Sequence, residues 1–242
     1  QKIDFIFNFN KNNFLVKDLD FKLNKIGFYS EKVSIKKKND NFFVDGALAN
    51  KKANLDKKNI DLLIKPFIPN FEIEKLLLTS DNNFSFEIQK GFKVENFKIN
   101  SEILVHELIM PNNLELKSFF PKQKKMISLI DQKLKLYYEK NNFAIKGNGI
   151  LIYQNEKDHL EYLLSNKNKT QNFEIILKTK DNPFKFDFLN YEKNKKNDVI
   201  LNLKGSRNKN NDLVIEAFNL NEDKNYIKIK NLVLNKKFEI SG

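Results

Sequence analysis

Regular alternation between apolar and polar side chains is the feature that most constrains how this chain folds. The first segment places Ile3, Phe5, Phe7 and Phe9 at every second position, and the side chains of a β-strand alternate between the two faces of a sheet. The same rhythm returns along the chain in roughly fifteen segments, separated by short connections rich in Asn, Lys and Gly. Such short connections join antiparallel neighbours. The pattern therefore predicts an all-β fold, an elongated antiparallel sheet of repeating β-hairpins.

The composition agrees with one long sheet. The chain has 242 residues, of which 40% are hydrophobic and 31% charged, so the apolar side chains have to gather on one side of each strand. Only 5 Pro and 7 Gly are present, which favours long strands over frequent sharp corners. No linker divides the chain, so residues 1–242 are expected to form one continuous segment. Because it starts at Gln1 and has no apolar run of about 18 residues, we expect a fragment of a larger protein.

Two stretches depart from the strand rhythm and predict short helices. Residues 54–69 carry apolar side chains at helical spacing after Asp56, a candidate N-cap, and before two prolines that would end the helix. Residues 121–132 place Met126, Ile127 and Ile130 on one helical face. The helical positions of the first stretch are Ile60, Leu63, Ile64 and Phe67, and its prolines are Pro66 and Pro69.

The charge of the chain admits a nucleic acid or an anionic membrane surface as a partner. The net charge is +12, but Lys, Asn, Ile and Phe are all encoded by AT-rich codons, and the lysines are scattered along the chain. No basic run is longer than Lys36–Lys38, and no nucleic-acid-binding module is recognised. The chain has no cysteine, which excludes disulfides and thiolate metal sites.

Residue patterns that support catalysis or cofactor binding are missing from the sequence. His106 and His159 lie in separate strand-like segments, and neither has a second His or Cys at metal-ligand spacing. The glycines Gly147 and Gly149 lack the third glycine and the following helix of a phosphate loop, and they favour a bulge or kink instead. We therefore expect no enzyme, no metal and no cofactor.

Four segments carry a resemblance to a known family. They are "NFFVDGALANKKANLD" from Asn41, "FEIEKLLLTSDNNFSFEI" from Phe71, "NPFKFDFLNYEKNKKNDVILNLKG" from Asn182 and "NYIKIKNLVLNKKFEISG" from Asn225. Their texture and order resemble the AsmA-like proteins of Gram-negative bacteria, and among them the large YhdP-type members. The resemblance covers most of the chain.

The resemblance implies a twisted β-sheet curled into an open groove in the periplasm, part of the cell envelope machinery of outer-membrane biogenesis. It implies anchoring to the inner membrane through a helix outside this fragment, and a partner at the outer-membrane side. The apolar groove would carry phospholipid acyl chains between the membranes without enzymatic chemistry. Strands spaced about 4.8 Å apart would let fifteen of them cover about 70 Å of path.

The segment from Asn182 to Gly205 is expected to be one hairpin of that lipid-facing wall. The period of two along each strand places the apolar residues of consecutive strands on one face. If this face lines a lipid groove, Phe186→Asp is expected to block lipid while sparing the fold. The predicted groove-lining residues are Ile175, Leu177, Phe184, Phe186, Phe188, Leu201, Leu203, Ile227 and Ile229.

Three other functions remain open at this stage. A structural or adhesive β-protein would fill its apolar faces with an ordinary packed core. An outer-membrane barrel also has alternating strands, but Trp is absent and every polar face is densely charged. A nucleic-acid-binding protein would need a clustered basic patch. A continuous apolar channel open to solvent is the observation that separates the groove from these alternatives.

Overall fold

The computed structural model describes residues 3–23, 26–63, 72–113, 116–140, 142–167, 170–187, 190–193, 196–207 and 213–234. These residues form an all-β fold with one short helix, α1 (Lys57–Leu63), and a small pair of strands, β11 (Lys185–Phe186) and β12 (Tyr191–Glu192). The other thirteen strands form the main sheet. They are β1 (Ile3–Asn10), β2 (Asn13–Leu23), β3 (Ile26–Lys38), β4 (Asn41–Leu55), β5 (Lys75–Ile88), β6 (Val94–Pro111), β7 (Met126–Glu139), β8 (Asn142–Ile152), β9 (Asp158–Lys167), β10 (Thr170–Thr179), β13 (Val199–Arg207), β14 (Leu213–Glu222) and β15 (Asn225–Leu234).

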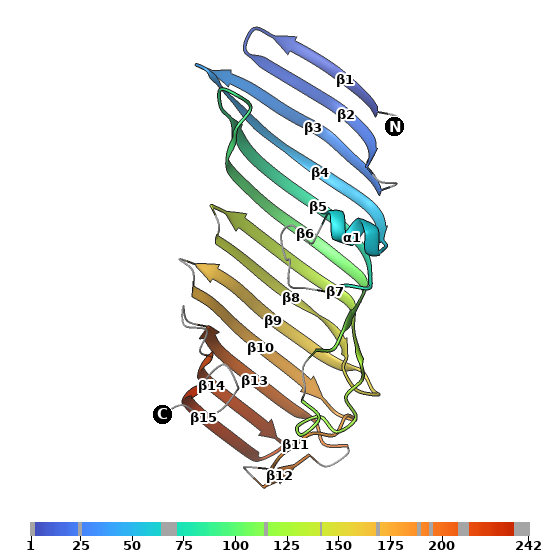
Figure 1. Cartoon of the computed structure of the whole chain (residues 1–242), viewed down its shortest axis with the longest axis vertical. Helices are drawn as coiled ribbons and strands as arrows, with labels where there is room; N and C mark the ends of the chain where they lie inside the picture. The colour runs from blue at the N-terminus through green and yellow to red at the C-terminus, as the bar shows by residue number, and fades with distance from the viewer. Residues whose placement is uncertain are drawn as a thin grey trace.

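The main sheet is a meander in which almost every strand pairs with its neighbours in the chain. The order runs from β1 to β10 and continues with β13, β14 and β15, and every pairing is antiparallel (Figure 1). The strands stack along the long axis, with β1 at one end and β15 at the other, and the sheet does not close into a barrel. The predicted elongated antiparallel sheet is confirmed.

The two long edges of the sheet differ in their connections. Along one edge, here called the turn rim, connections of two to five residues join β1 to β2, β3 to β4, β5 to β6, β7 to β8 and β9 to β10. Lys11, Asn39 and Lys140 in three of these turns have φ of 42°, 56° and 48°, as two-residue hairpin turns require. The opposite edge, the loop rim, carries α1 between β4 and β5 and the longer connections 112–125 and 180–198.

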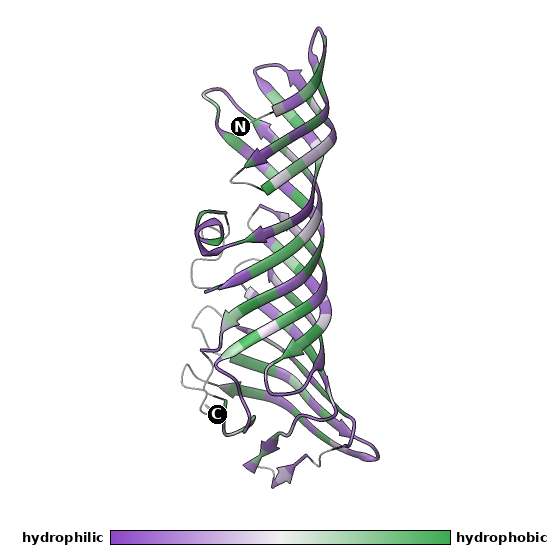
Figure 2. Cartoon of the chain, turned by 90° about the vertical axis from the view of Figure 1, so that its right-hand side faces the viewer, coloured by the Kyte–Doolittle hydropathy of each residue, from purple (hydrophilic) through white to green (hydrophobic). Residues whose placement is uncertain are grey.

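Cross-strand pairing keeps apolar side chains on one face of the sheet. One row passes from β2 to β8 and another from β7 to β15, so together they span the sheet. This apolar face is concave, with α1 on its open side (Figure 2), and we call it the trough. The first row is Val16, Val33, Gly46, Phe84, Ile99, Tyr138 and Phe143; the second is Leu136, Ile145, Leu164, Phe173, Gly205, Ile215 and Leu232.

Helix α1 begins where the sequence predicts it. The carboxylate of Asp56 accepts a hydrogen bond from the Asn59 amide at 2.9 Å, and the Asp56 carbonyl accepts one from Ile60, so Asp56 is the N-cap. Ile60 is buried against the trough. The expected positions Ile64, Pro66, Phe67 and Pro69 lie outside the described residues.

The second predicted helix is wrong, because residues 126–139 form β7. The pairing of β7 with β8 shifts register between Ile130 and Lys133, and Asp131 has a φ of 50°. Such a bulge inserts one residue into a strand and breaks its alternation. The bulge follows Ile130, so the helical spacing of Met126, Ile127 and Ile130 has another cause. Apolar side chains occur on both faces at the start of β7, where Ile127 is 8% exposed and its neighbour Met126 36%.

The glycines of β8 lie opposite this bulge rather than forming one themselves. They make room for large side chains that lie flat across the trough floor. A Cβ on Gly147 would stand 2.4 Å from the Tyr162 ring, and one on Gly149 would stand 2.5 Å from the Gln132 amide. The predicted irregularity is therefore present, but the extra residue belongs to β7.

The segment from Asn182 to Gly205 corrects the sequence prediction. It was expected to be a hairpin of the main sheet, but only β13 at its end belongs there, and β13 pairs directly with β10. Phe186 lies in β11, which pairs with β12 outside the main sheet, and Phe184 precedes it. Their rings pack down onto the trough instead of extending it.

Candidate functional site

The trough is the candidate functional site. At its C-terminal end, Ile175 pairs with Leu203, and this row continues through Phe218 to Ile229. A neighbouring row joins Leu177, Leu201, Leu220 and Ile227. Six of the nine predicted groove residues therefore share the apolar face, as their parity indicated.

Two of the other three predicted groove residues, Phe184 and Phe186, are not part of the main sheet. Phe184 is 1% exposed and Phe186 is 9% exposed, and both belong to the material that covers the trough. They also bury Leu201 and pack against Leu177 and Ile227. Phe188 lies outside the described residues. Only Ile175, Leu203 and Ile229 of the predicted set lie beyond this cover.

A first packed cluster lies along the loop rim near α1. Ile60 of α1 and Ile73 of the following segment sit on the ends of β3, β4 and β5 and on β6. The sheet residues beneath them are Ile26, Ala53, Leu55, Leu76 and Val105. This part of the trough is filled by the chain itself.

A second packed cluster covers the loop rim at the C-terminal end. The ring of Phe186 lies 5.7 Å from Phe119, 5.6 Å from Phe184 and 5.5 Å from Phe218, measured between ring centroids. Phe119 comes from the 112–125 connection, so two loops distant in sequence meet here over β14. Such aromatic contacts add to the burial of the rings.

Polar groups close the outer margin of the second cluster. The Tyr191 hydroxyl donates to the Glu222 carboxylate at 3.0 Å, and the Asn182 amide donates to Asp158 at 2.8 Å. Burial raises the pKa of the Asp158 carboxyl above its ordinary value and lowers that of the Lys193 ammonium. The Lys193 ammonium donates to the Lys180 carbonyl. These contacts tie the 180–198 segment to the edge of the sheet.

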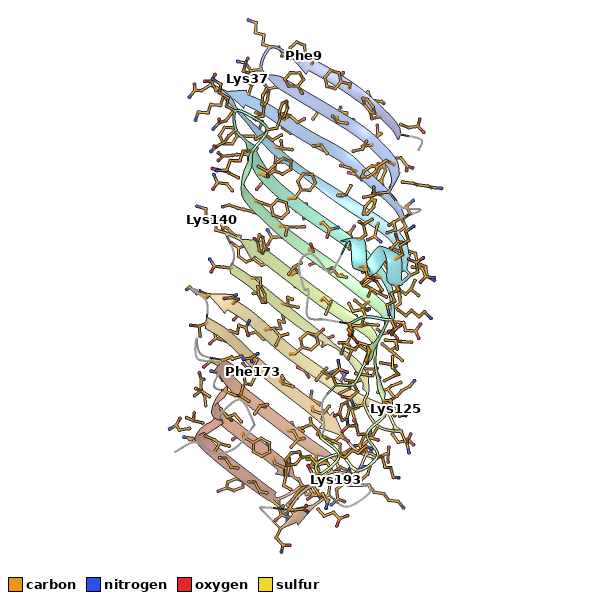
Figure 3. All side chains as sticks on the ribbon, in the orientation of Figure 1. Phe9, Lys37, Lys125, Lys140, Phe173 and Lys193 are labelled. Atoms are coloured by element: carbon orange, nitrogen blue, oxygen red, sulfur yellow. The ribbon has the colours of Figure 1, made fainter. Side chains whose placement is uncertain are left out.

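The half of the trough beside the turn rim has a different character. A row of large apolar side chains, here called the aromatic row, follows it from β1 to β7, with Ile35 and Val44 between its two groups of rings. Ring centroids lie 4.7 Å apart between Phe9 and Phe14, 6.4 Å between Phe86 and Phe97, and 6.0 Å between Phe97 and Tyr138. Phe9 is 60% exposed and Phe97 38%, although both carry large apolar rings. The trough is thus filled at the loop rim and solvent-accessible at the turn rim (Figure 3).

Phe7 and Phe9 stand out in the sequence as alternating residues, but the predicted groove residues all come from the last third of the chain and include no member of this aromatic row. The signal was present in the alternating "NFSFEI" from Asn83, which puts Phe84 and Phe86 on one face. Bulges between Ser85 and Glu87 obscure the continuation into β6. The cross-strand register was needed to align Phe86 with Phe97.

The outer face of the sheet carries charged side chains together with exposed apolar ones such as Leu163 and Ile200, each 41% exposed, and it has open hollows. One of them is lined by Glu102, Lys135 and Lys146, and the Lys135 ammonium lies 3.0 Å from the Glu102 carboxylate. Exposed pairs of this kind contribute about 0–1 kcal/mol to stability. They keep the outer face in water and bring no reactive groups together.

The two histidines remain apart from each other and from any metal-ligand set. The His106 ring lies 3.0 Å from the Thr79 hydroxyl on β5, and His159 lies 3.4 Å from Glu161 on its own strand. Within the described ranges, no group of three His, Asp or Glu side chains is arranged to hold a metal ion. The geometry that stands out is the half-open apolar trough.

Comparison with known proteins adds no assignment: no family model, curated protein or solved structure matches the chain. Among the helices in the described part of the chain, none has the length and apolar character needed to cross a membrane.

Proposed function

We propose that this chain carries phospholipid acyl chains along the open half of the trough, as a non-enzymatic lipid-transfer segment. One observation carries the proposal: the apolar face runs across thirteen strands, and large aromatic rings on it remain exposed along the turn rim. At about 4.8 Å per strand, the trough extends about 58 Å. A soluble monomer rarely exposes so long an apolar surface without a ligand.

The physical basis is the cost of moving an acyl chain through water. Each buried CH₂ group is worth about 0.8 kcal/mol, so a chain of about fifteen such groups would lose about 12 kcal/mol on leaving a membrane. A largely apolar wall lowers this barrier along its length. Its polar members Asn50 and Ser80 are buried and hydrogen-bonded to each other. The wall needs no specific contact at any one point, which is consistent with the scattered histidines and the unclustered carboxylates.

The proposal includes a setting. We place the trough in the periplasm of a Gram-negative cell, between an inner membrane that anchors the larger protein and the outer membrane. The AsmA-like texture of the sequence supports this setting, and so does an open trough of the length expected for a segment of such a bridge. Phospholipid is the partner of the trough, and nucleic acid is not.

A structural β-protein is the second candidate, and the packed clusters at the loop rim favour it. Ile60, Phe184 and Leu220 are as buried as residues of an ordinary core. That function would require the turn-rim half of the trough to be covered as well. The exposure of Phe7 and Phe9, at 51% and 60%, supports lipid transfer instead.

The test uses two adjacent residues of β10 that face opposite sides. The 242-residue chain is incubated with phospholipid vesicles, reisolated, and weighed by native mass spectrometry. Ile175→Asp places a carboxylate in the trough and is expected to abolish lipid loading. Ile176→Asp places it on the outer face, opposite Asn202, and is expected to leave loading unchanged. Absence of lipid from the parent chain, or equal loading of both variants, contradicts the proposed function.

A further inference from the structure

The charged residues at the two ends of the trough rows differ in sign. Lys37 lies two residues beyond Ile35 on β3 and is paired with Phe42, so it extends the apolar face to the turn rim. Arg207 occupies the corresponding end of β13. At the loop-rim ends of the same face stand two carboxylates, Asp158 and Glu222, paired with Leu151 and Val199.

The turns of the turn rim add further positive charge. Lys11, Lys90 and Lys140 occupy three of its turns and are all exposed. Lys37 and Lys140 project at this edge in Figure 3, close to the aromatic row. No carboxylate of the described residues lies within ion-pair distance of Lys11, Lys37 or Lys140, although the Lys98 ammonium, the Tyr137 hydroxyl and Lys140 together lower the pKa of Glu139, the neighbour of Lys140. Lys93 pairs with Glu95 at 2.5 Å. Most of these cations are therefore available to an anion from solution.

The trough is covered at the loop rim, so an anion bound there would not lie beside an open part of the trough. The two carboxylates at the loop-rim ends of the trough rows, Asp158 and Glu222, are buried. The cover formed by α1 and the 180–198 segment packs over the trough on that side. Along this rim lysines alternate with acids, as in Glu156, Lys157 and Asp158. Basic stretches also occur at this rim: Lys51 and Lys52 near the end of β4, and the 117–125 connection, in which Lys122, Lys124 and Lys125 are exposed.

We propose that the turn rim binds the anionic phosphate headgroups of lipids whose acyl chains lie in the trough. This inference rests on the proposed function and deepens it, because it assigns an orientation and a lipid class. The lipids lie across the strands, with their tails against the aromatic row and their phosphates beside Lys11, Lys37 and Lys140. Zwitterionic lipids of the same chain length would gain less from this rim.

The experiment compares two lipids and two charge-reversed variants of the 242-residue chain. Vesicles of phosphatidylglycerol or phosphatidylcholine with identical acyl chains are offered, and the lipid carried by the reisolated protein is quantified. The parent is expected to load phosphatidylglycerol with a roughly fivefold preference at low salt, and the preference is expected to fall as ionic strength rises.

The rim variant combines Lys11→Glu, Lys37→Glu and Lys140→Glu, and it is expected to lose the preference while still taking up phosphatidylcholine. The matched control combines Lys122→Glu, Lys124→Glu and Lys125→Glu, which are exposed on the loop-rim connection and change the net charge equally. The control is expected to keep the preference. The melting temperatures of both variants are measured alongside, to verify that they are folded.

Three results overturn the inference. In the first, the parent loads both lipids equally. In the second, the control loses the preference as fully as the rim variant, which assigns the effect to net charge. In the third, inorganic phosphate at equal concentration displaces phosphatidylglycerol, which assigns the rim to a soluble anion. Uptake without preference leaves the proposed function intact, whereas no uptake of either lipid removes both proposals.

Discussion

Phe186→Asp distinguishes a cover residue from a groove residue. Parity alone predicted that this change would block lipid and spare the fold, but the structure predicts the reverse. The Phe186 side chain is 9% exposed and touches the rings of Phe119, Phe184 and Phe218. Removing a phenylalanine from such a site costs about 3–5 kcal/mol, and a buried unpaired carboxylate adds a further penalty.

The whole fold is expected to have a free energy of unfolding of about 5–15 kcal/mol, so this loss is a large part of it. Urea denaturation of Phe186→Asp should show a strongly lowered midpoint, while Phe186→Leu, which keeps an apolar side chain, should lose much less. Ile175→Asp, in the open half of the trough, should also stay close to the parent. A parent-like midpoint for Phe186→Asp would show that the cover is not part of the cooperatively folded sheet, and the reasoning would be wrong.

Three further predictions follow from the described contacts. Gly205→Ala is expected to lower the free energy of unfolding by about 1–3 kcal/mol, because the new Cβ would stand 2.3 Å from the Val214 carbonyl oxygen. The control Gly27→Ala would meet no atom within 4 Å, so its melting temperature should be nearly that of the parent. Burial raises the pKa of Tyr162 to about 12, so the fold favours the neutral phenol. The stability that this phenol contributes should be complete below the unfolded pKa of about 10 and lost as the pH rises toward 12. Tyr162→Phe should remove that part of the pH dependence of the melting temperature. Burial also raises the pKa of Asp158, so the ionised carboxylate opposes folding at neutral pH. Asp158→Asn should therefore raise the melting temperature at pH 7. This difference from the parent should disappear as the pH falls below the unfolded pKa of about 4.

Local pattern was sufficient to predict most of the fold. Alternation such as Val33 and Ile35, or Leu201 and Leu203, fixes which side chains share a face, because a strand has a period of two. The N-cap at Asp56 was also predicted, since its hydrogen bond is made within its own helix. Antiparallel order followed from short connections, which leave no room for a crossover.

Features that depend on distant partners were not predictable from the sequence. Phe184 and Phe186 alternate like strand residues, but their place is decided by contacts with Phe119 and Phe218, which are far away in the chain. Apolar side chains on both faces at the start of β7, such as Met126 and Ile127, gave this strand the appearance of a helix, and the bulge after Ile130 interrupts the alternation further along. The sequence likewise gave no sign that one rim of the trough is filled and the other open.

The most direct test of lipid transfer asks which side of the sheet touches acyl chains. A photo-crosslinking amino acid replaces Ile99, on the trough row between Phe84 and Tyr138, or Asn100, its neighbour on the outer face. After illumination with phospholipid vesicles, the mass of each protein is measured. We expect a lipid adduct at residue 99 and none at residue 100. Equal adducts at both positions, or none at residue 99, would contradict a trough that carries lipid.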